Sequence, residues 1–526
     1  MFRILVTEPL AEEGLQLLCQ QAEVDVKPSL APTALAAVIA PYEGLVVRSK
    51  TLVTEEVIAA APRLVVIGRA GTGVDNIDLE AATRRGIVVV NAPYGNTVSV
   101  AEHTLAMLLA LVRHIPRADS ALHQGQWDKP SCQGVQVRGK VLGLVGLGRI
   151  GTAVARRALG LEMKVVGYDP LVTPARAAQM GVQWVSWEEL LRNADFVSLH
   201  LPESEQTHSL ISSRELAMIK PSAYLINCAR GSLVDEQALL QALQEGRLAG
   251  AALDVFAQEP PLDSPLLHCD NVILTPHVAG STEEAQRDTA VEVAQQVLDV
   301  LAGHIPRYPV NAPSLSPDEL EQLGPYLDLA QRLGSFYAQL AGDHLQAVEV
   351  SCTGDVASQR VDLILSAVLV GLLAATSEEA VNWINAQVVA RERGIAFAGR
   401  HEPLRSTAGW ANLIELRLSV DSQQRVVAGA VLRGEPHIVH IDGYWLDFVA
   451  RGLLLISEHT EQPGILGRMG TVLGDAGINI HFVQVGRRER GGPGILVLGL
   501  DDPLTPEARE QVLSLPSIRS ARMVRL

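Results

Sequence analysis

The most constraining feature of this sequence is a glycine-rich turn between two short apolar stretches. Residues 140–145 (KVLGLV) are apolar enough for a buried strand, and a helix is predicted over 152–159. Three glycines between them have G-x-G-x-x-G spacing, namely Gly146, Gly148 and Gly151. A second apolar stretch, 164–168, ends at Asp169. Strand, glycine turn, helix, strand and acid in this order predict a βαβ unit within a parallel sheet.

This predicted unit suits a dinucleotide. The first glycine permits the tight turn, the second lets the backbone approach a pyrophosphate, and the third brings the helix onto the strand. The phosphates then lie at the helix N-terminus, where free N–H groups and the helix dipole favour anions. Asp169 can accept hydrogen bonds from both hydroxyls of the adenosine ribose and would repel a 2′-phosphate. We therefore predict an NAD site, with an ordinary strand-to-helix turn as the alternative.

Length and composition exclude several other classes of protein. A chain of 526 residues exceeds one hydrophobic core and predicts about three to four domains. Its net charge of −16 argues against nucleic acid as a partner, and five scattered cysteines without C-x-x-C spacing argue against a metal site. The N-terminus begins as a strand without a signal segment, and the longest apolar run, 363–375, is short of the ~20 residues that span a bilayer. We expect a cytoplasmic protein with no membrane partner.

Strand and helix patterns divide the chain into four units. The first two alternate short apolar strands with helices, which predicts a flavodoxin-like parallel sheet and a doubly wound Rossmann-type sheet in the α/β class. An α+β unit follows a proline-rich linker over 303–317, and the last unit has the strand–helix–strand–strand–helix–strand order of a ferredoxin-like fold. In chain order the units are 1–98 together with 286–312, 99–285, 318–450 and 452–526.

Three short strings follow predicted strands downstream of the glycine turn, and each supplies one reactive side chain. The residues are Arg230 in CARG, Glu259 in DVFAQEP and His277 in TPHVAG. Because parallel strands end at one edge of a sheet, we expect the three to converge at the nicotinamide end of the cofactor. An arginine fork holds a carboxylate, a histidine takes the proton of a hydroxyl group, and a carboxylate orients the histidine ring. The set predicts oxidation of a 2-hydroxy acid.

Over the first 310 residues or so, the chain resembles the D-isomer-specific 2-hydroxyacid dehydrogenases. The resemblance rests on VVRSK, GRAGTGVDN, GLVGLGRIG, INCARGSLVDE, AALDVFAQEPP and TPHVAGST. It implies that Arg230, Glu259 and His277 are catalytic, with His277 as proton acceptor during oxidation. It also implies NAD contacts from Thr72, Gly146, Gly148, Arg149, Ile150, Gly151, Asp169, Leu201, Cys228, Ala229, Arg230, Asp254, His277, Val278, Ala279 and Gly280.

Positive charge near the substrate indicates the branch of the family. Arg48 and Arg69 lie in loops where the long, phosphoglycerate-oxidising branch presents cations, with Gly71 beside them and Arg230 on the substrate carboxylate. Lys129 is expected to add to a phosphate site, across a dimer. The resemblance thus implies NAD-dependent oxidation of D-3-phosphoglycerate to 3-phosphohydroxypyruvate, the first step of L-serine biosynthesis. Plain surface charge is the alternative, above all for Lys129.

The second half of the chain carries a further resemblance. Residues 318–450, mostly through LSAVLVGLLAATSEEAVNWINA, resemble the intervening, allosteric-substrate-binding domain of that branch. The last unit resembles an ACT domain, which implies feedback inhibition by L-serine bound at His459, Glu461 and Asn479. The acid at the second of these positions is usually aspartate, so Glu461 departs from the pattern. A homodimer or homotetramer is expected, with serine bound between subunits.

Two other functions remain open from the sequence. One is a different substrate on the same fold, as in a glyoxylate, hydroxypyruvate or D-lactate reductase. The other is a non-enzymatic, NAD-sensing protein that binds a partner. Single residues also have structural alternatives: His277 can be a hydrogen-bonded structural histidine, and Glu102 and His103 on the apolar helix over 99–113 read as packed helix residues.

Overall fold

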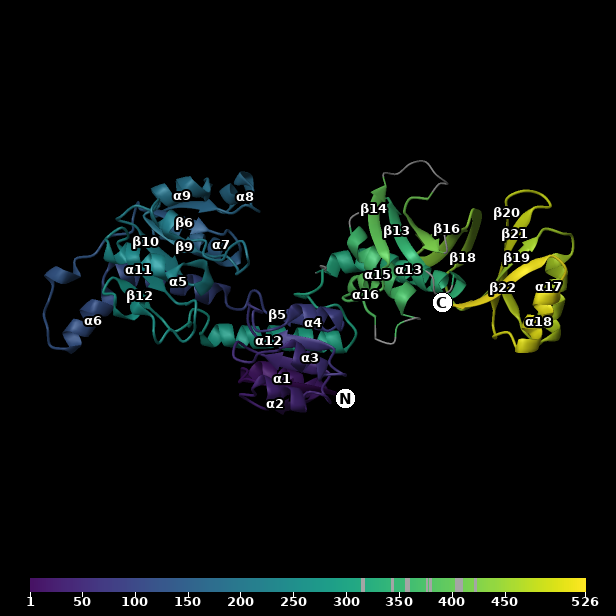
Figure 1. The fold of residues 1–526 in the computed structure, drawn as a ribbon, viewed down its shortest axis with the longest axis horizontal. Helices are drawn as coiled ribbons and strands as arrows, with labels where there is room; N and C mark the ends of the chain where they lie inside the picture. The colour runs from purple at the N-terminus through teal and green to yellow at the C-terminus, as the bar shows by residue number, and fades with distance from the viewer. Residues whose placement is uncertain are drawn as a thin grey trace.

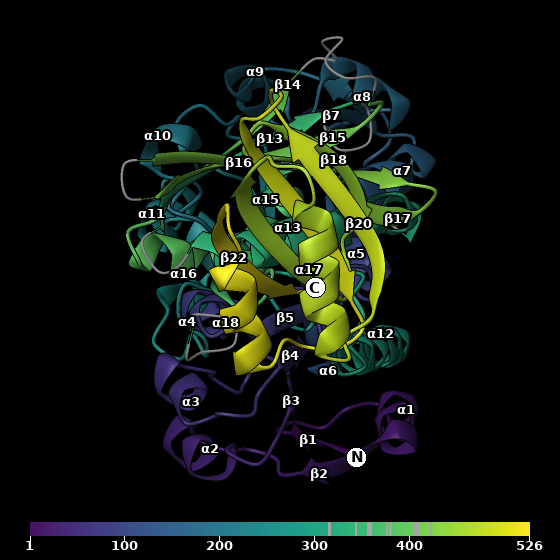
Figure 2. The same cartoon turned by 90° about the vertical axis from the view of Figure 1, so that its right-hand side faces the viewer.

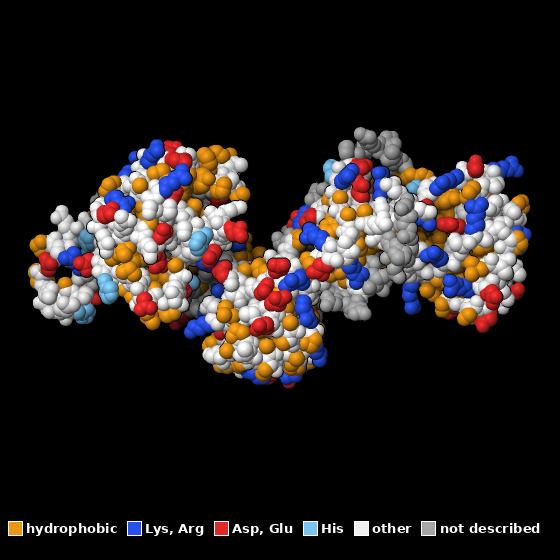
Figure 3. All heavy atoms as spheres, viewed as in Figure 1, with side chains coloured by type: hydrophobic (Ala, Val, Ile, Leu, Met, Phe, Trp, Pro, Cys, Tyr) orange, Lys and Arg blue, Asp and Glu red, His pale blue; other side chains and the backbone are white. Residues whose placement is uncertain are grey.

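The structure is a computed structural model that describes residues 1–313, 317–341, 345–354, 360–374, 377, 381–402, 410–420 and 423–526. It has four sheets, one in each unit expected from the sequence. Figure 1 shows the four units spread along the long axis of the molecule. The glycine-turn unit is at the left and the first unit is below the centre. The third unit is to the right of the centre, and the tail is at the far right. Acidic and basic side chains are interspersed over the face that Figure 3 shows.

The first unit is a five-stranded parallel sheet in the order β2-β1-β3-β4-β5. Its elements are β1 (Phe2–Val6), α1 (Glu12–Gln21), β2 (Ala22–Val26), α2 (Pro32–Val38), β3 (Gly44–Val47), α3 (Glu55–Ala59), β4 (Val66–Arg69), α4 (Leu79–Arg84) and β5 (Val88–Asn91). Helix α12 (Glu283–Leu301) returns from the end of the second unit to pack on α1, β4 and β5. A Cβ at Gly68 would lie 2.6 Å from a Val297 methyl, so glycine allows this close packing.

The second unit is a seven-stranded parallel sheet in the order β12-β11-β10-β9-β6-β7-β8. Its strands are β6 (Val141–Val145), β7 (Lys164–Tyr168), β8 (Gln183–Trp184), β9 (Phe196–Leu199), β10 (Tyr224–Asn227), β11 (Gly250–Leu253) and β12 (Val272–Leu274). Its helical segments are α5 (Thr97–Val112), α6 (Ile115–His123), η1 (Pro130–Cys132), α7 (Arg149–Gly160), α8 (Pro174–Gln179), α9 (Trp187–Asn193), α10 (Ser213–Leu216), η2 (Gly231–Leu233), α11 (Glu236–Gln244) and η3 (Pro265–His268). The strand order reverses at β6, and the carboxyl end of that strand is where such sheets bind ligands.

The third unit has a mixed six-stranded sheet in the order β14-β13-β15-β16-β17-β18, with α13 and α15 packed against each other beside it. Its elements are α13 (Pro317–Ala341), β13 (Leu345–Thr353), α15 (Val361–Leu373), α16 (Ala386–Glu392), β14 (Ala396–Glu402), β15 (Leu413–Val420), β16 (Gln423–Leu432), β17 (Glu435–Ile441) and β18 (Tyr444–Val449). The predicted linker includes 314–316 and the predicted apolar helix includes Ala375, which lie outside the described residues.

The tail is a four-stranded antiparallel sheet in the order β20-β21-β19-β22. Its elements are β19 (Leu453–Thr460), α17 (Ile465–Asp475), β20 (Ile480–Arg487), β21 (Pro493–Leu500), α18 (Pro506–Ser514) and β22 (Ile518–Arg525). Figure 2 shows α17 and α18 side by side on one face of this sheet. The expected ferredoxin-like order of the tail, and the fold classes of the other units, are therefore confirmed. The unit boundaries stay a prediction.

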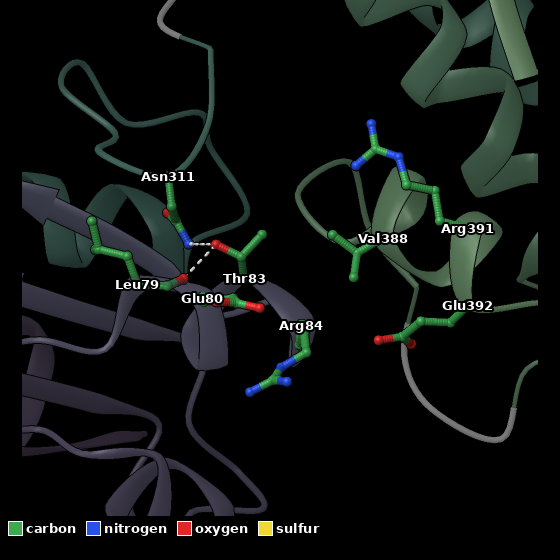
Figure 4. Close-up of a pocket in the computed structure, with 8 residues that line it drawn as sticks. All are labelled: Leu79, Glu80, Thr83, Arg84, Asn311, Val388, Arg391 and Glu392. Carbon is green, nitrogen blue, oxygen red and sulfur yellow. Dashed lines mark hydrogen bonds between the residues drawn. The ribbon is translucent and has the colours of Figure 1, made fainter. Parts of the chain in front are cut away.

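The third unit contacts the first through the segment before α16. Asn382 Nδ2 donates to the carbonyl of Gly86 at 2.7 Å, and Ile384 joins the core that α12 covers. A cavity of about 530 Å³ lies beside this contact, between α4 and α16. Figure 4 shows its lining residues Leu79, Glu80, Thr83, Arg84, Asn311, Val388, Arg391 and Glu392.

In the described part of the chain, no single helix has the length and apolar character to cross a membrane. Only α5 and α6 taken together, which are bent by 64°, have that length and composition. Most of α5 is buried in the second unit.

Candidate active site

The glycine turn has the geometry that a pyrophosphate needs. Gly146 has a φ of 96°, and a Cβ there would lie 2.5 Å from the carbonyl oxygen of His200. A Cβ at Gly151 would collide with the Gly146 carbonyl, so this glycine holds α7 close to the strand. At Gly148, by contrast, no atom lies within 4 Å of an added Cβ. The residues therefore fit a bound NAD: the turn is closed on the protein side and open where the phosphates approach.

Asp169 lies at the end of β7, as predicted, and also shapes the turn. Its Oδ2 accepts a hydrogen bond from the Leu147 amide at 2.9 Å, and its Oδ1 accepts one from the Leu171 amide at 2.8 Å. Each carboxylate oxygen has a second lone pair, so both ribose hydroxyls can still be accommodated. Arg149 lies nearby, over the Tyr94 ring at 4.6 Å, while Ile150 and Leu201 are partly buried beside the same turn.

His277 and Glu259 form a hydrogen-bonded pair in the position expected for catalysis. His277 Nδ1 lies 2.8 Å from Glu259 Oε2, and both side chains are partly exposed, at 49% and 39%. His277 has a φ of 54°, and its amide donates to the Asp254 carbonyl at 2.8 Å. Glu259 in turn accepts from the Phe256 amide at 3.2 Å. With Nδ1 directed at a carboxylate, the Nε2 lone pair is left to act as a base.

Asp254 organises the loop that contains His277. Its carboxylate is fully buried and accepts from Thr275 Oγ1 at 2.6 Å and from the amides of Val278 and Ala279 at 2.9 Å each. Burial raises the pKa of this carboxyl, but hydrogen bonds from His103, Thr275 and the two amides outweigh it, so the pKa is lowered. The structure therefore gives Asp254 a role in shaping the loop, and its contact with NAD stays a prediction.

Arg230 follows β10, and it reaches across to the first unit. Its Nε donates to Asp75 Oδ2 at 3.1 Å, and its Nη1 donates to the Ala229 carbonyl at 2.7 Å. Asn227 holds this loop, because its Nδ2 donates to the Arg230 carbonyl and its Oδ1 accepts from the Ala229 amide. Cys228 is buried, and burial, aided by the charge of Asp254, raises the pKa of its thiol to about 12. This cysteine is therefore an uncharged wall residue.

The three catalytic candidates come from neighbouring strands. Arg230 follows β10, Glu259 follows β11 and His277 follows β12, and these strands are adjacent in the sheet. The loops touch as well, since a Cβ at Gly231 would collide with the backbone of Phe256. The structure thus brings the predicted set to one edge of the sheet, beside the reversal point at β6.

Two arginines of the first unit lie at the carboxyl edge of its sheet: Arg48 directly follows β3, and Arg69 is the last residue of β4. Burial, together with the nearby charge of Arg230, lowers the pKa of Arg69 to about 10. Its Nε has no hydrogen-bond partner among the described residues. A Cβ at Gly71 would collide with the Arg69 guanidinium, so this glycine makes room for it. Arg48 Nη1 donates to the Pro9 carbonyl at 3.2 Å, which leaves its charge without a carboxylate partner in the described part of the chain. The positive charge here is not fully compensated and suits an anion.

Two residues that were not predicted as site residues, Glu8 and Asn76, hold the loop that begins with Arg48. Glu8 is buried, and its carboxylate accepts from the amides of Arg48, Lys50 and Thr51. Asn76 Nδ2 donates to the carbonyls of Arg48 and Thr51. These residues, like Asp75 and Asn227, are polar groups directly after buried strands or in the loops that follow, and that position was the signal that could have identified them.

Thr72 lies between the loop of Arg69 and the start of α5. Its Oγ1 donates to Asn96 Oδ1 at 2.8 Å, and its carbonyl accepts from Asn91 Nδ2 at 2.5 Å. Asn96 reaches Gly280 on the other side, where an added Cβ would lie 3.3 Å from Asn96 Nδ2. Thr72 and Gly280 are therefore close to one another, as expected for two sides of a nicotinamide site.

Lys129 is not brought to this site within one chain. It precedes η1, which packs on α6, and Figure 1 shows α6 in an arm that extends away from the first unit. The arm is apolar for an exposed segment: α6 has no buried residue, and Ile115, Leu122 and Trp127 are 53%, 59% and 83% exposed.

The three predicted effector residues lie at two ends of the tail sheet. His459 pairs with Gly494 near one end of β21, whereas Ile480, next to Asn479, pairs with Leu500 at the other end. The structure therefore does not bring Asn479 to His459 within one chain. Asn479 Nδ2 instead donates to Asp501 Oδ2 at 2.7 Å. Burial lowers the pKa of His459, which is 2% exposed.

Glu461 already has partners in the tail. Its Oε2 accepts from the Gly491 amide at 2.7 Å and its Oε1 accepts from Arg487 at 2.6 Å, and these bonds lower the pKa of its carboxyl. Glu461 thus closes the turn between β20 and β21. An ammonium group at Glu461 would have to share the carboxylate with Arg487.

Comparisons with known proteins agree with these features. Residues 105–279 match the D-isomer specific 2-hydroxyacid dehydrogenase NAD binding domain, 322–442 the D-3-phosphoglycerate dehydrogenase intervening domain and 453–517 the ACT domain. The chain is 42% identical to D-3-phosphoglycerate dehydrogenase from Methanocaldococcus jannaschii, over 100% of both chains. It is also 42% identical to the Synechocystis enzyme of that name, over 100% of this chain and 95% of the relative. A D-lactate dehydrogenase from Aquifex aeolicus, solved with NAD and lactic acid, matches 59% of this chain and all of its own length, with 31% identity and a TM-score of 0.54.

Proposed function

The chain belongs to the D-3-phosphoglycerate dehydrogenase family, and from this premise we propose that it oxidises D-3-phosphoglycerate with NAD to 3-phosphohydroxypyruvate. That reaction opens the synthesis of L-serine. The observation that carries the proposal is that two features lie side by side where Arg230 contacts the first unit through Asp75. Arg230, Glu259 and His277 follow adjacent strands of one sheet, and Arg69, at the end of β4, lies near enough to Arg230 for the two positive charges to repel each other.

His277 is the proposed proton acceptor. Its Nδ1 faces Glu259 at 2.8 Å, so the proton on Nδ1 is donated to the carboxylate and Nε2 is left unprotonated. Nε2 can then take the proton from the 2-hydroxyl of the substrate, and Glu259 stabilises the imidazolium that results. Bound NAD supplies the acceptor for the hydride that leaves the same carbon.

Arg230 is the proposed anchor of the substrate carboxylate. Asp75 and Ala229 engage its Nε and Nη1, which fixes the plane of the guanidinium, and Nη2 lies against Gly73, where an added Cβ would be 2.2 Å away. A planar fork held in this way orients a carboxylate better than a point charge does. The hydroxyl carbon of the substrate is thereby directed toward His277.

Arg69 and Arg48 are proposed to hold the phosphate. Arg69 is partly buried, and burial and the positive charge of Arg230 lower its pKa to about 10 although the charges of Asp75 and Glu8 oppose that shift. A phosphate dianion would compensate both arginines, whereas glycerate or lactate would leave them uncompensated. This feature favours phosphoglycerate over the substrates of other D-2-hydroxyacid dehydrogenases, such as the similar D-lactate enzyme.

NAD is proposed to lie along the glycine turn. Gly148 leaves the phosphate position open, and Asp169 is placed for the ribose hydroxyls and against a 2′-phosphate. Thr72, Cys228 and Gly280 are proposed to line the nicotinamide end. We also propose that Arg149, Ile150, Leu201 and Ala279 contact the NAD molecule between its pyrophosphate and its nicotinamide.

We also propose L-serine as effector and a homo-oligomer as the working form. His459 and Asn479 lie at opposite ends of one tail sheet, so two tails related by a two-fold axis would bring His459 of one chain to Asn479 of the other. The exposed apolar arm around α6 supports a second contact between copies, which would carry Lys129 toward a neighbouring cleft.

The test is turnover by the full chain. Formation of NADH with phosphoglycerate, and little with glycerate or D-lactate, is expected; no turnover with phosphoglycerate would refute the proposal. Titration of the full chain with L-serine in a calorimeter, paired with an inhibition assay, tests the effector. We expect binding and inhibition in the parent and loss of both in Asn479→Ala, whereas no heat at millimolar serine would leave the tail without this role.

A further inference from the structure

Helix α5 lies against both ends of the loop that contains His277. His103 Nε2 lies 3.1 Å from Thr275 Oγ1, just before the loop, and Ser99 Oγ lies 2.7 Å from Thr282 Oγ1, just after it. Asn96, at the start of the helix, reaches Gly280 in between. Positions 96, 99 and 103 lie on one face of an α-helix, so these contacts come from a single side of α5.

The hydrogen positions of this contact follow from its partners. Thr275 has one hydroxyl hydrogen, and it points to the buried carboxylate of Asp254, only 2.6 Å away. The Thr275 oxygen is therefore left as an acceptor, and His103 has to present a proton on Nε2. His103 Nε2 also lies 3.5 Å from Asp254 Oδ1. A directed chain of donors thus runs from α5 through Thr275 to Asp254.

Asp254 passes this constraint to the catalytic residue. Its carboxylate accepts from the amides of Val278 and Ala279, and its carbonyl accepts from the amide of His277. His277 itself has a φ of 54°, a conformation that few residues adopt without support from their surroundings. The loop conformation that aims His277 therefore depends on Asp254, and Asp254 depends on a fixed Thr275.

We infer that His103 and Ser99 are positioning residues that hold the 275–282 loop, and with it His277, in the geometry of hydride and proton transfer. This inference rests on the proposed function, because it assigns His277 the role of base. It also links the loop to the chain connection between the first two units, because α5 begins directly after the segment that follows β5. The sequence reading of His103 as a packed helix residue is thereby extended to a role in the reaction.

The decisive comparison is His103→Leu with His103→Gln. A glutamine amide can place a donor near the position of Nε2, whereas leucine fills space without one. We expect His103→Leu to lower kcat by about tenfold or more, on the scale of a small misplacement of a reacting group, with the KM for phosphoglycerate nearly unchanged because arginines on other loops hold that substrate. His103→Gln should recover most of kcat. Ser99→Ala should lower kcat less, again without a change in KM.

Glu102→Gln is the matched control. Glu102 is the neighbour of His103 on α5, but it is 62% exposed and pairs with Arg157 instead. It should keep the parent kcat. With phosphoglycerate deuterated at carbon 2, the isotope effect on kcat should rise in His103→Leu, because misalignment slows the chemical step.

An unchanged kcat in folded His103→Leu, or equal losses in the leucine and glutamine variants, would overturn the inference. If the leucine variant does not fold, His103→Asn replaces it: asparagine is too short to reach Thr275, so it should lose kcat while glutamine keeps it, and equal rates in the two would again overturn the inference. Failure of the parent enzyme to oxidise phosphoglycerate is a separate result, which would contradict the proposed function instead.

Discussion

Replacing Arg69 with glutamine is expected to weaken phosphoglycerate binding and to stabilise the fold at the same time. The guanidinium is held in a partly buried position next to Arg230, and its Nε has no hydrogen-bond partner among the described residues. Burial first, and the charge of Arg230 second, lower its pKa from the usual value of an arginine to about 10. The Arg69 guanidinium therefore carries its positive charge at a position where that charge destabilises the folded state.

The sizes of the expected changes in stability and in the KM for phosphoglycerate both follow from this environment. At neutral pH Arg69 is charged in the folded and unfolded states, so its lowered pKa means that the folded state is destabilised, by at most about 3 kcal/mol. The cost would begin to fall only as the pH rises through about 10, and it would be gone once Arg69 is neutral in both states. Glutamine removes it, and the free energy of unfolding should rise. Loss of a charge-assisted contact with the phosphate is worth about 1.5 to 3 kcal/mol, or about 10- to 150-fold in KM.

The assay combines urea unfolding with steady-state kinetics. Arg69→Gln should raise the unfolding midpoint, raise the KM for phosphoglycerate and leave the KM for NAD nearly unchanged. Arg63→Gln is the control, because Arg63 belongs to the same unit but is 62% exposed and already paired with Glu43. A less stable Arg69→Gln variant with the parent KM for phosphoglycerate would refute the reasoning.

Three other substitutions test further parts of the site. Arg230→Lys should lower kcat/KM by about 100-fold or more in a folded protein, because a point ammonium cannot reproduce the fork; near-normal kinetics would remove Arg230 from the mechanism. Glu259→Gln should lower kcat by about 100-fold or more, since an amide can donate to Nδ1 of His277 and so favour the tautomer whose Nε2 is protonated; retention of kcat would show that the pair does not set the tautomer. Burial lowers the pKa of His200 from 6.5 to about 4, so the stability that depends on its neutral form is complete above pH 6.5 and decreases toward pH 4. His200→Gln, measured by urea unfolding, should therefore lose less stability on acidification than the parent, and an equal loss would contradict that burial.

The sequence predicted the structure best at sites where a local pattern and its chemistry point to the same element. The glycine turn, Asp169 and the tail order were predicted because each is a short pattern with one mechanical reason. The helix after the turn begins at Arg149 and not at residue 152, since the last glycine of the motif already lies in its first turn. In the third unit β14, β17 and β18 have no clear strand pattern in the sequence, because polar and mixed stretches such as 435–441 become strands through pairing with their neighbours.

Residues that act through others were harder to predict. Glu8 supports Arg48 and Asp75 supports Arg230 from positions 40 and 155 residues away in the chain, whereas Asn227 lies only three residues from Arg230. A single sequence marks such polar residues by their place at the end of a strand, but it does not tell which arginine each one supports, because that depends on how the strands and units are arranged. The effector residues show the same limit, since Asn479 and His459 prove to lie at opposite ends of one sheet.

The most direct test of the account is NADH formation by the purified full chain with D-3-phosphoglycerate, D-glycerate and D-lactate as alternative substrates. We predict that kcat/KM for phosphoglycerate exceeds that for glycerate by at least about tenfold, the value of one charge-assisted phosphate contact, and that Arg69→Gln removes most of the difference. Equal kcat/KM values for phosphoglycerate and glycerate in the parent enzyme would contradict the central claim.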